Sequence, residues 1–167
     1  MEKWEYAAPC LFGIEGILGD ELKRMDAQDV RVQNGRVLFS GGPDLLARAN
    51  IGSRYAERIQ VHLGSFQAVS FEELFQGVRA LPWENWIGKK DAFPVKGWSL
   101  NSALHSVPDC QSIIKKAIVE RLKSVYGLSW FEESGAVVQV QFTLLKDEAT
   151  LLLDTSGPGL HKRGYRQ

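Results

Sequence analysis

The dipeptide Asn34-Gly35 lies between two alternating apolar runs, 30–33 and 36–40. It is the strongest short-range signal for a β-hairpin, because both central positions of such a turn need a positive φ. The chain is predicted to form a strand and a helix before this hairpin and a helix and a strand after it, over 4–10, 12–25, 45–50 and 58–63. The resulting order of strand, helix, strand, strand, helix, strand is the ferredoxin-like order.

Glycines and acidic residues recur along the first predicted helix. We interpret the glycines, spaced in steps of three, as a smooth stripe that packs closely on the sheet. They form no dinucleotide-binding loop, since no Gly-x-Gly pair is present. The acidic residues are expected on a solvent-facing side and are too dispersed for a metal or acid–base site. The glycines are Gly13, Gly16 and Gly19, and the acidic residues are Glu15, Asp20 and Glu21.

The following part of the chain is predicted to hold two helices and three strands. Ser70 with Glu73, and Ser106 with Asp109, are capping boxes that mark where the two helices begin. The predicted order is helix, strand, helix, strand, strand, over 70–81, 92–100, 108–126, 137–145 and 149–153. This order indicates an α/β sandwich in which the last two strands form a hairpin.

The helix predicted over 108–126 has two different faces. Lys116 and Lys123 lie opposite its apolar side, with Lys115 at the border, and Glu120 partly neutralises the first two. Arg121 falls within the apolar side, where it either reaches the edge or pairs with a carboxylate or phosphate; we favour a structural role. The apolar side consists of Ile113, Ile114, Ala117, Ile118, Leu122 and Val125.

Trp83 and Trp86 follow the first helix of this part. Both indoles offer a ring on which a nucleic-acid base could stack. Packing against the core is the favoured interpretation, because tryptophan side chains bury large areas wherever they lie.

Charge and cysteine content limit the possible functions. Twenty basic and twenty acidic residues cancel, so any nucleic-acid site must be local. Cys10 and Cys110 are far apart, which argues against a disulfide scaffold or a zinc site and fits a reducing cytoplasm. No stretch is long and apolar enough for a membrane span, so we expect no membrane partner.

The end of the chain combines a buried strand with a basic tail. The apolar run 150–153 ends at Asp154, and Gly157-Pro158-Gly159 follows. Residues 155–167 carry three basic and no acidic side chains, which suits a phosphate-rich partner. A solvated terminus is the alternative interpretation.

The segment from Asp154 to Arg166, Asp-Thr-Ser-Gly-Pro-Gly-Leu-His-Lys-Arg-Gly-Tyr-Arg, resembles the sequence that closes the THUMP domain of bacterial RNA methyltransferases. The relatives in this family are the large-subunit ribosomal RNA guanine-N2 methyltransferases and the uncharacterised THUMP methyltransferases. Residues 9–15 and 35–39 resemble the family's ferredoxin-like domain, and 112–122 resemble the THUMP core. The resemblance implies an α+β fold: a ferredoxin-like domain over 1–66, an α/β THUMP domain over 67–160, and a linker from 161 to a C-terminal methyltransferase domain.

The resemblance also implies a function. The two domains bind structured RNA, with ribosomal RNA favoured and transfer RNA possible, while a C-terminal domain of the same polypeptide transfers a methyl group from S-adenosylmethionine. Lysine and arginine side chains select an RNA fold through phosphate contacts. The RNA-binding role is carried onto Lys96, Lys115, Lys116, His161, Lys162, Arg163, Tyr165 and Arg166.

The sequence departs from the family pattern at its end. It stops at Gln167, without a Gly-rich cofactor loop and without the Pro-Pro segment that seats a flipped guanine. We therefore expect the N-terminal half of a longer cytoplasmic methyltransferase. This half is expected to have no catalytic residue, metal or cofactor and to be inactive alone. A stand-alone THUMP RNA-binding adaptor and a ferredoxin-like interaction module that binds no RNA remain as alternatives.

Overall fold

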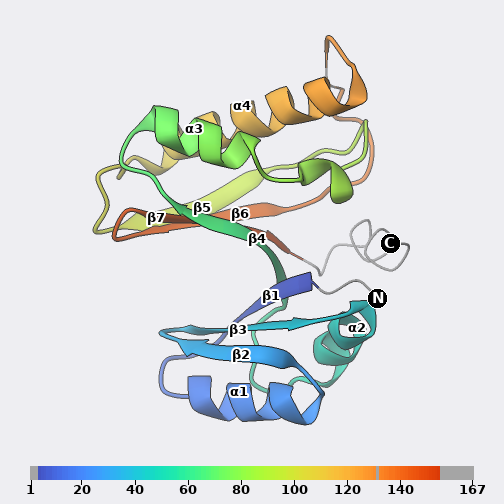
Figure 1. Cartoon of the computed structure of the whole chain (residues 1–167), viewed down its shortest axis with the longest axis vertical. Coiled ribbons are helices and arrows are strands. Elements are labelled where there is room, and N and C mark those ends of the chain that lie inside the picture. Colours follow the sequence, from blue (N-terminus) through green and yellow to red (C-terminus); the bar gives the residue numbers. More distant parts are fainter. Residues whose placement is uncertain (1–3, 131, 155–167) are drawn as a thin grey trace. The chain divides into compact units, whose positions relative to one another are not determined.

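A computed structural model describes residues 4–130 and 132–154 of the chain (Figure 1). These residues form two compact units: the first holds the described residues up to His62 together with Asp154, the second those from Leu63 to Leu153, and strand β4 (Gln60–Gln67) runs from one into the other. In the described ranges, no helix combines the length and the apolar character that crossing a membrane requires.

The first unit has the predicted ferredoxin-like order. Its strands pair antiparallel in the spatial order β2-β3-β1-β4, and the long strand β4 pairs with β1 through Gln60 and Val61. Its elements are β1 (Trp4–Pro9), α1 (Glu15–Arg24), β2 (Gln28–Gln33), β3 (Arg36–Gly41), α2 (Pro43–Gly52) and β4 (Gln60–Gln67).

The predicted hairpin is present between β2 and β3, but its turn differs from the expected one. Gly35 has a φ of 80°, whereas Asn34 is not among the residues with positive φ. The side chain of Glu15 also holds the turn. Its carboxylate accepts the amide N–H of Gly35 and that of Gly13, both at 2.8 Å. These N–H donors, the Gly35 amide first, hold the pKa of Glu15 below its usual value.

Glycine packing on the sheet is confirmed at one position of the predicted stripe. A Cβ at Gly19 would lie 3.2 Å from Val32 Cγ2 on β2, so α1 approaches the sheet closely there. A Cβ at Gly13 or Gly16 would meet nothing within 4 Å. The stripe interpretation is wrong for these two positions, because they lie before and in the first turn of the helix, away from β2.

The second unit is an α/β sandwich in which α3 and α4 cover the same face of the sheet (Figure 1). Its strand order is β4-β7-β6-β5, with β5 parallel to β6 and β6 antiparallel to β7. The remaining elements are α3 (Phe71–Arg79), the 3-10 turn η1 (Trp83–Asn85), β5 (Val95–Leu100), α4 (Val107–Tyr126), β6 (Val140–Leu145) and β7 (Glu148–Asp154).

Both serines predicted to cap the helices of this unit are confirmed as N-caps. The hydroxyl oxygen of Ser70 accepts the N–H of Glu73 at 3.2 Å, and that of Ser106 accepts the N–H of Asp109 at 3.4 Å. Each cap satisfies one of the amide donors left open at the start of a helix. Helix α4 ends at Gly127, whose φ of 66° is the left-handed conformation that terminates many helices.

The apolar side of α4 is largely as predicted. Ile114, Ala117, Ile118 and Leu122 are buried, but the assignment of Val125 to this side is wrong, since its side chain is 45% exposed. In the last turn the neighbouring Tyr126 takes the inward role, because its hydroxyl donates to the carbonyl oxygen of Ile87 at 2.6 Å.

The favoured interpretation of the two tryptophans is confirmed as well. Trp83 is fully buried and Trp86 is 6% exposed. The indole N–H of Trp83 donates to the carbonyl oxygen of Val78 at 2.7 Å, which satisfies the polar atom of this buried ring. Neither ring is available for stacking on a base.

Candidate nucleic-acid interface

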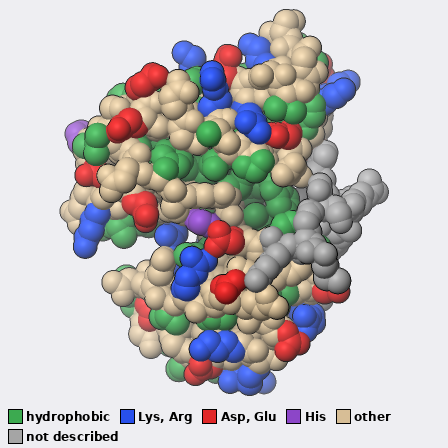
Figure 2. Space-filling model, in the orientation of Figure 1, with side chains coloured by type: hydrophobic (Ala, Val, Ile, Leu, Met, Phe, Trp, Pro, Cys, Tyr) green, Lys and Arg blue, Asp and Glu red, His purple; other side chains and the backbone are tan. Residues whose placement is uncertain are grey.

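The structure describes three of the eight residues predicted to bind RNA. Lys96 lies on β5, and Lys115 and Lys116 lie in α4. On the face of the molecule seen in Figure 2, the described Lys and Arg side chains are interspersed with Asp and Glu and form no continuous basic patch. The outcome for each cation therefore depends on its immediate partners. The other predicted residues, His161, Lys162, Arg163, Tyr165 and Arg166, lie outside the described residues.

Lys115 is engaged inside the second unit. Its ammonium donates to a carboxylate oxygen of Glu133 at 2.6 Å and to the carbonyl oxygen of Phe93 at 3.1 Å, and it lies 3.8 Å from the centroid of the Phe93 ring. Burial would raise the pKa of Glu133. The hydrogen bonds from Lys115 and from the Phe93 N–H outweigh burial and hold this pKa below its usual value. Lys115 therefore ties α4 to two loops.

Lys116 lies one position further along and has a different environment. Its side chain is exposed, and within the described part of the chain it makes no hydrogen bond or ion pair. Lys123, on the same side of the helix, has its ammonium 3.9 Å from a Glu120 oxygen. Lys116 is thus the α4 lysine whose charge is open to an outside phosphate.

Arg121 forms a two-pronged ion pair with Glu84. The Nε and Nη2 atoms of its guanidinium donate to the two carboxylate oxygens at 2.9 and 2.8 Å. These hydrogen bonds hold the pKa of Glu84 below its usual value and raise the pKa of Arg121. The structural role favoured for Arg121 is confirmed, with a carboxylate as the partner.

An exposed aromatic side chain near Lys96 was not predicted from the sequence. Lys96, Trp98 and Leu100 alternate along β5, and Trp98 is 47% exposed. Gly97 lies between them on the face covered by α4, where a Cβ would come within 2.3 Å of Phe142. Trp98 therefore points to the opposite face of this sheet, which α3 and α4 do not cover. The period-two alternation of residues 96–100 was the available signal.

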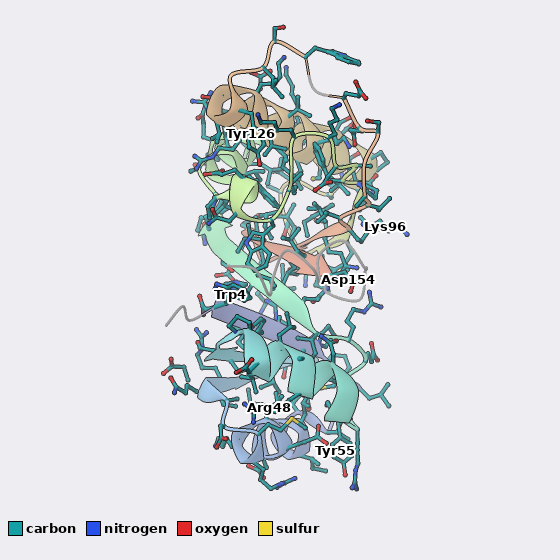
Figure 3. The ribbon with its side chains drawn as sticks, turned by 90° about the vertical axis from the view of Figure 1, so that its right-hand side faces the viewer. Trp4, Arg48, Tyr55, Lys96, Tyr126 and Asp154 are labelled. Carbon is teal, nitrogen blue, oxygen red and sulfur yellow. The ribbon has the colours of Figure 1, made fainter. Side chains whose placement is uncertain are left out.

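On this face of the sheet, β5 presents a cation and an aromatic ring two residues apart. Figure 3 shows the Lys96 side chain extending outward from the sheet. Side chains two residues apart on a strand are about 7 Å apart, which suits contact with a phosphate by one and stacking of a base on the other. In register on β6, Lys96 is opposite Gln141 and Trp98 is opposite Thr143. We name Lys96 and Trp98 the β5 strip.

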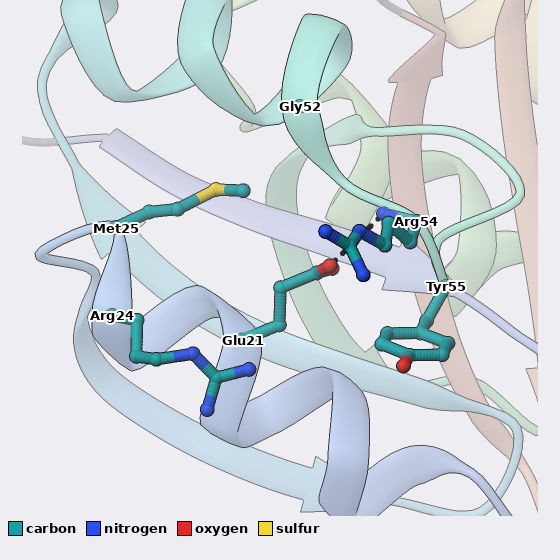
Figure 4. A pocket seen from close by; sticks show the side chains of 6 residues that line it. All are labelled: Glu21, Arg24, Met25, Gly52, Arg54 and Tyr55. Carbon is teal, nitrogen blue, oxygen red and sulfur yellow. Dashed lines mark hydrogen bonds between the residues drawn. The ribbon is translucent and has the colours of Figure 1, made fainter.

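A second feature is a pocket of about 260 Å³ in the first unit (Figure 4). It contains Glu21, which was expected on a solvent-facing side. That expectation is wrong, since Glu21 is 7% exposed and its carboxylate accepts from the Ser53 hydroxyl at 2.6 Å and the Arg54 N–H at 3.0 Å. These partners follow more than 30 residues later, so helix periodicity alone could not reveal them. The pocket is lined by Glu21, Arg24, Met25, Gly52, Arg54 and Tyr55.

The described residues contain no cluster of potential metal ligands, and their two thiols are buried. No group of three or more His, Cys, Asp or Glu side chains is placed there to hold a metal ion. Cys10 and Cys110 are buried free thiols, and burial is the main cause that raises the pKa of each.

Comparison with known proteins identifies two domain families in the chain. Residues 5–60 match the family described as the RlmL ferredoxin-like domain, and residues 68–154 match the THUMP domain. The putative RNA methyltransferase YpsC of Bacillus subtilis is 46% identical over 99% of this chain, which covers 43% of YpsC. The ribosomal RNA large subunit methyltransferase K/L of Cellvibrio japonicus is 33% identical over 97% of this chain and 22% of its own length.

A solved structure extends the similarity to the three-dimensional fold. SMU.472, a putative methyltransferase whose crystal structure is a complex with SAH, superposes with a TM-score of 0.88 at 43% sequence identity. The match covers all of this chain and 45% of SMU.472. The chain thus spans less than half the length of each of these three relatives.

Proposed function

Because the chain belongs to the THUMP family, with an RlmL-type ferredoxin-like domain and homologues that are RNA methyltransferases, we propose that it is the RNA-targeting half of such an enzyme. The observation that carries the proposal is the 46% identity to a putative RNA methyltransferase over 99% of the chain. The ferredoxin-like domain is taken as 1–66 and the THUMP domain as 67–160. Residues 161–167 then begin the linker to a catalytic domain of the same polypeptide.

The proposed substrate is ribosomal RNA, and the proposed reaction is methylation of guanine N2. The name of the K/L relative supports a large-subunit ribosomal RNA. The SAH bound to SMU.472 supports S-adenosylmethionine as the methyl donor of the whole enzyme. This chain would contribute recognition of the RNA and no catalytic group. A ribosomal RNA substrate would place the enzyme in the cytoplasm.

The proposed RNA surface combines two described regions with the basic tail. The β5 strip offers a cation and a ring, and Lys116 offers an unpaired cation. Lys115 was predicted to share this role, but its contacts with Glu133 and Phe93 favour a structural one. The tail residues proposed to contact phosphate are Lys162, Arg163 and Arg166, with His161 and Tyr165 as their neighbours in the sequence.

A titration with two nucleic acids tests this function. The chain is mixed with a structured RNA hairpin and with a DNA duplex of equal length over a range of salt concentrations. We expect binding that prefers RNA and weakens with salt, because phosphate contacts release counterions. Absence of RNA binding even at low salt would overturn the proposal and favour an interaction module that binds no RNA.

A double variant tests whether the basic tail contacts the RNA. Replacing both Lys162 and Arg163 by alanine should weaken RNA binding and reduce the salt slope by about one to two phosphate contacts. An unchanged slope would remove the tail from the proposed surface while leaving the RNA-targeting function in place.

A further inference from the structure

Two arginines of the first unit line a pocket, and neither guanidinium has a partner among the described residues. The guanidinium groups of Arg24 and Arg54 make no hydrogen bond or ion pair with other described residues, although both line the 260 Å³ pocket. Arg31 and Arg48 of the same unit instead pair with Glu5 and Asp26. Arginine carries its charge at all physiological pH values, so an unpaired pair in one concavity favours an anion.

The wall of this pocket is held in place by hydrogen bonds. The Ser53 hydroxyl donates to Glu21 at 2.6 Å and accepts the N–H of Ala56 at 3.2 Å, while the Arg54 N–H donates to the other Glu21 oxygen at 3.0 Å. This network fixes the loop that follows α2, on which Arg54 and Tyr55 lie. The pocket is therefore preorganised, which lowers the entropy cost of binding.

The negative charge of Glu21 does not neutralise the positive charge of the pocket lining. Both of its carboxylate oxygens are used by the loop, and the pocket lining holds two positive formal charges and one negative. Figure 4 shows Arg24 and Tyr55 extending toward each other from α1 and from the loop after α2, with Glu21 between them. A guanidinium and an aromatic ring thus face the same space.

The size of the pocket limits what it can hold. A volume of about 260 Å³ lies just below the range of drug-sized ligand sites, so it suits a small part of a longer ligand, such as one nucleotide unit. Guanidinium groups bind phosphate oxygens in a two-pronged geometry, and an aromatic ring stacks on any base. One nucleotide unit of a nucleic acid presents both of these groups together.

We propose that the pocket between the C-terminal ends of α1 and α2 binds one backbone phosphate of the RNA, between Arg24 and Arg54, with the attached nucleoside against Tyr55. The site adds a contact point in the ferredoxin-like domain to the surface of the THUMP domain. This inference rests on the proposed function, because it specifies how the same RNA is held.

Three variants of the 167-residue chain test the site by titration with a structured RNA hairpin over a range of salt. The double variant Arg24→Gln/Arg54→Gln should bind about tenfold more weakly at 0.1 M salt, with a salt slope reduced by about one, since one phosphate contact is lost. Tyr55→Leu should lose about fivefold or more in affinity without a change in slope, because stacking carries no charge. Arg79→Gln is a control that removes one positive charge, since Arg79 is exposed on α3 of the second unit and does not line the pocket, and it should change affinity less than twofold.

The outcomes separate this inference from the proposed function. If the wild-type chain binds RNA and the double variant binds like Arg79→Gln, the pocket site is overturned and the RNA-targeting function stands. If the wild-type chain binds no RNA even at low salt, both are overturned.

A measurement on the wild-type chain covers the case in which a variant does not fold. Amide chemical shifts of residues 52–55 should move on addition of the RNA hairpin, while those of residues 79–80 should not. Unmoved shifts at 52–55 in an RNA-saturated sample would overturn the pocket site.

Discussion

The cations of α4 and those of the α1–α2 pocket have the same formal charge and different environments. In α4, Lys115 and Arg121 each donate to a carboxylate of their own unit, Glu133 and Glu84. In the pocket, the guanidinium groups of Arg24 and Arg54 have no such partner among the described residues. A chain with zero net charge can therefore still present cations to RNA, because pairing is unevenly distributed.

The paired cations act as connections within the second unit. Glu84 lies 37 residues before Arg121, and Glu133 lies 18 residues after Lys115. Each pair joins α4 to a segment that is distant in sequence, so it stabilises the unit in place of binding a partner. The following predictions test this division between structural and available charge.

The largest effect should come from the apolar contacts beneath α4. Ile118 is fully buried, so Ile118→Ala should lower the free energy of unfolding by about 2–5 kcal/mol through lost burial and a cavity. The RNA affinity of the folded variant should be unchanged. Val125→Ala is the control, since Val125 is 45% exposed and should cost less than about 1 kcal/mol. Urea unfolding and RNA titration check both variants; a loss of affinity without a loss of stability would refute this orientation of α4.

A smaller loss of stability is expected when the Arg121 pair is broken. Glu84→Gln removes one charge from a partly buried two-pronged pair and should cost about 1–2 kcal/mol in urea unfolding. The salt slope of RNA binding should not change. Glu148→Gln, at an exposed site on β7, makes the same charge change and should be nearly neutral. Equal stability of the two variants would show that the pair is not structural.

Neighbouring lysines provide the most direct contrast. Lys115→Gln should lower stability by about 0.5–1 kcal/mol, because it breaks a partly exposed ion pair, and should leave the salt slope of RNA binding unchanged. Lys116→Gln should leave stability unchanged and reduce the salt slope by about one. Thermal unfolding together with RNA titration measures both; the reverse pattern would exchange the two roles.

The smallest effect should appear as a pH dependence. Hydrogen bonds from Arg121 lower the pKa of Glu84 in the folded chain, so the unfolded chain binds its proton at a higher pH. The stabilisation is fully present above the unfolded pKa of about 4.3. It is lost as the pH falls toward the folded pKa. The stability difference between the wild type and Glu84→Gln should therefore shrink between about pH 5 and pH 3, as urea unfolding would measure. A difference that stays constant over this range would contradict the lowered pKa.

Local signals in the sequence predicted the elements well, since each depends on residues close together. The capping serines Ser70 and Ser106 and the Asn34-Gly35 hairpin are examples. The ferredoxin-like order and the THUMP similarity followed from the order of such elements and from the sequence motifs.

Side-chain roles were harder to predict where the partner is far away in the sequence. Glu21 was predicted to face solvent, because helix periodicity carries no information about the distant loop whose Ser53 hydroxyl donates to its carboxylate. The partner of Lys115 was invisible for the same reason, since Glu133 lies in a loop. Trp98 was overlooked although its alternation with Lys96 is local, because no cluster of basic residues surrounds it.

Because the Arg54 amide donates a hydrogen bond to Glu21, the hydrogen-exchange rate of this amide reports the opening of the loop after α2. At 3.0 Å from a carboxylate oxygen that is nearly buried, this N–H can exchange its hydrogen with solvent only when the loop opens. Its exchange rate therefore reports how often the loop opens, without any label or substitution. An RNA held in the pocket would slow that exchange, and the factor of slowing would measure how strongly binding and loop closure are coupled.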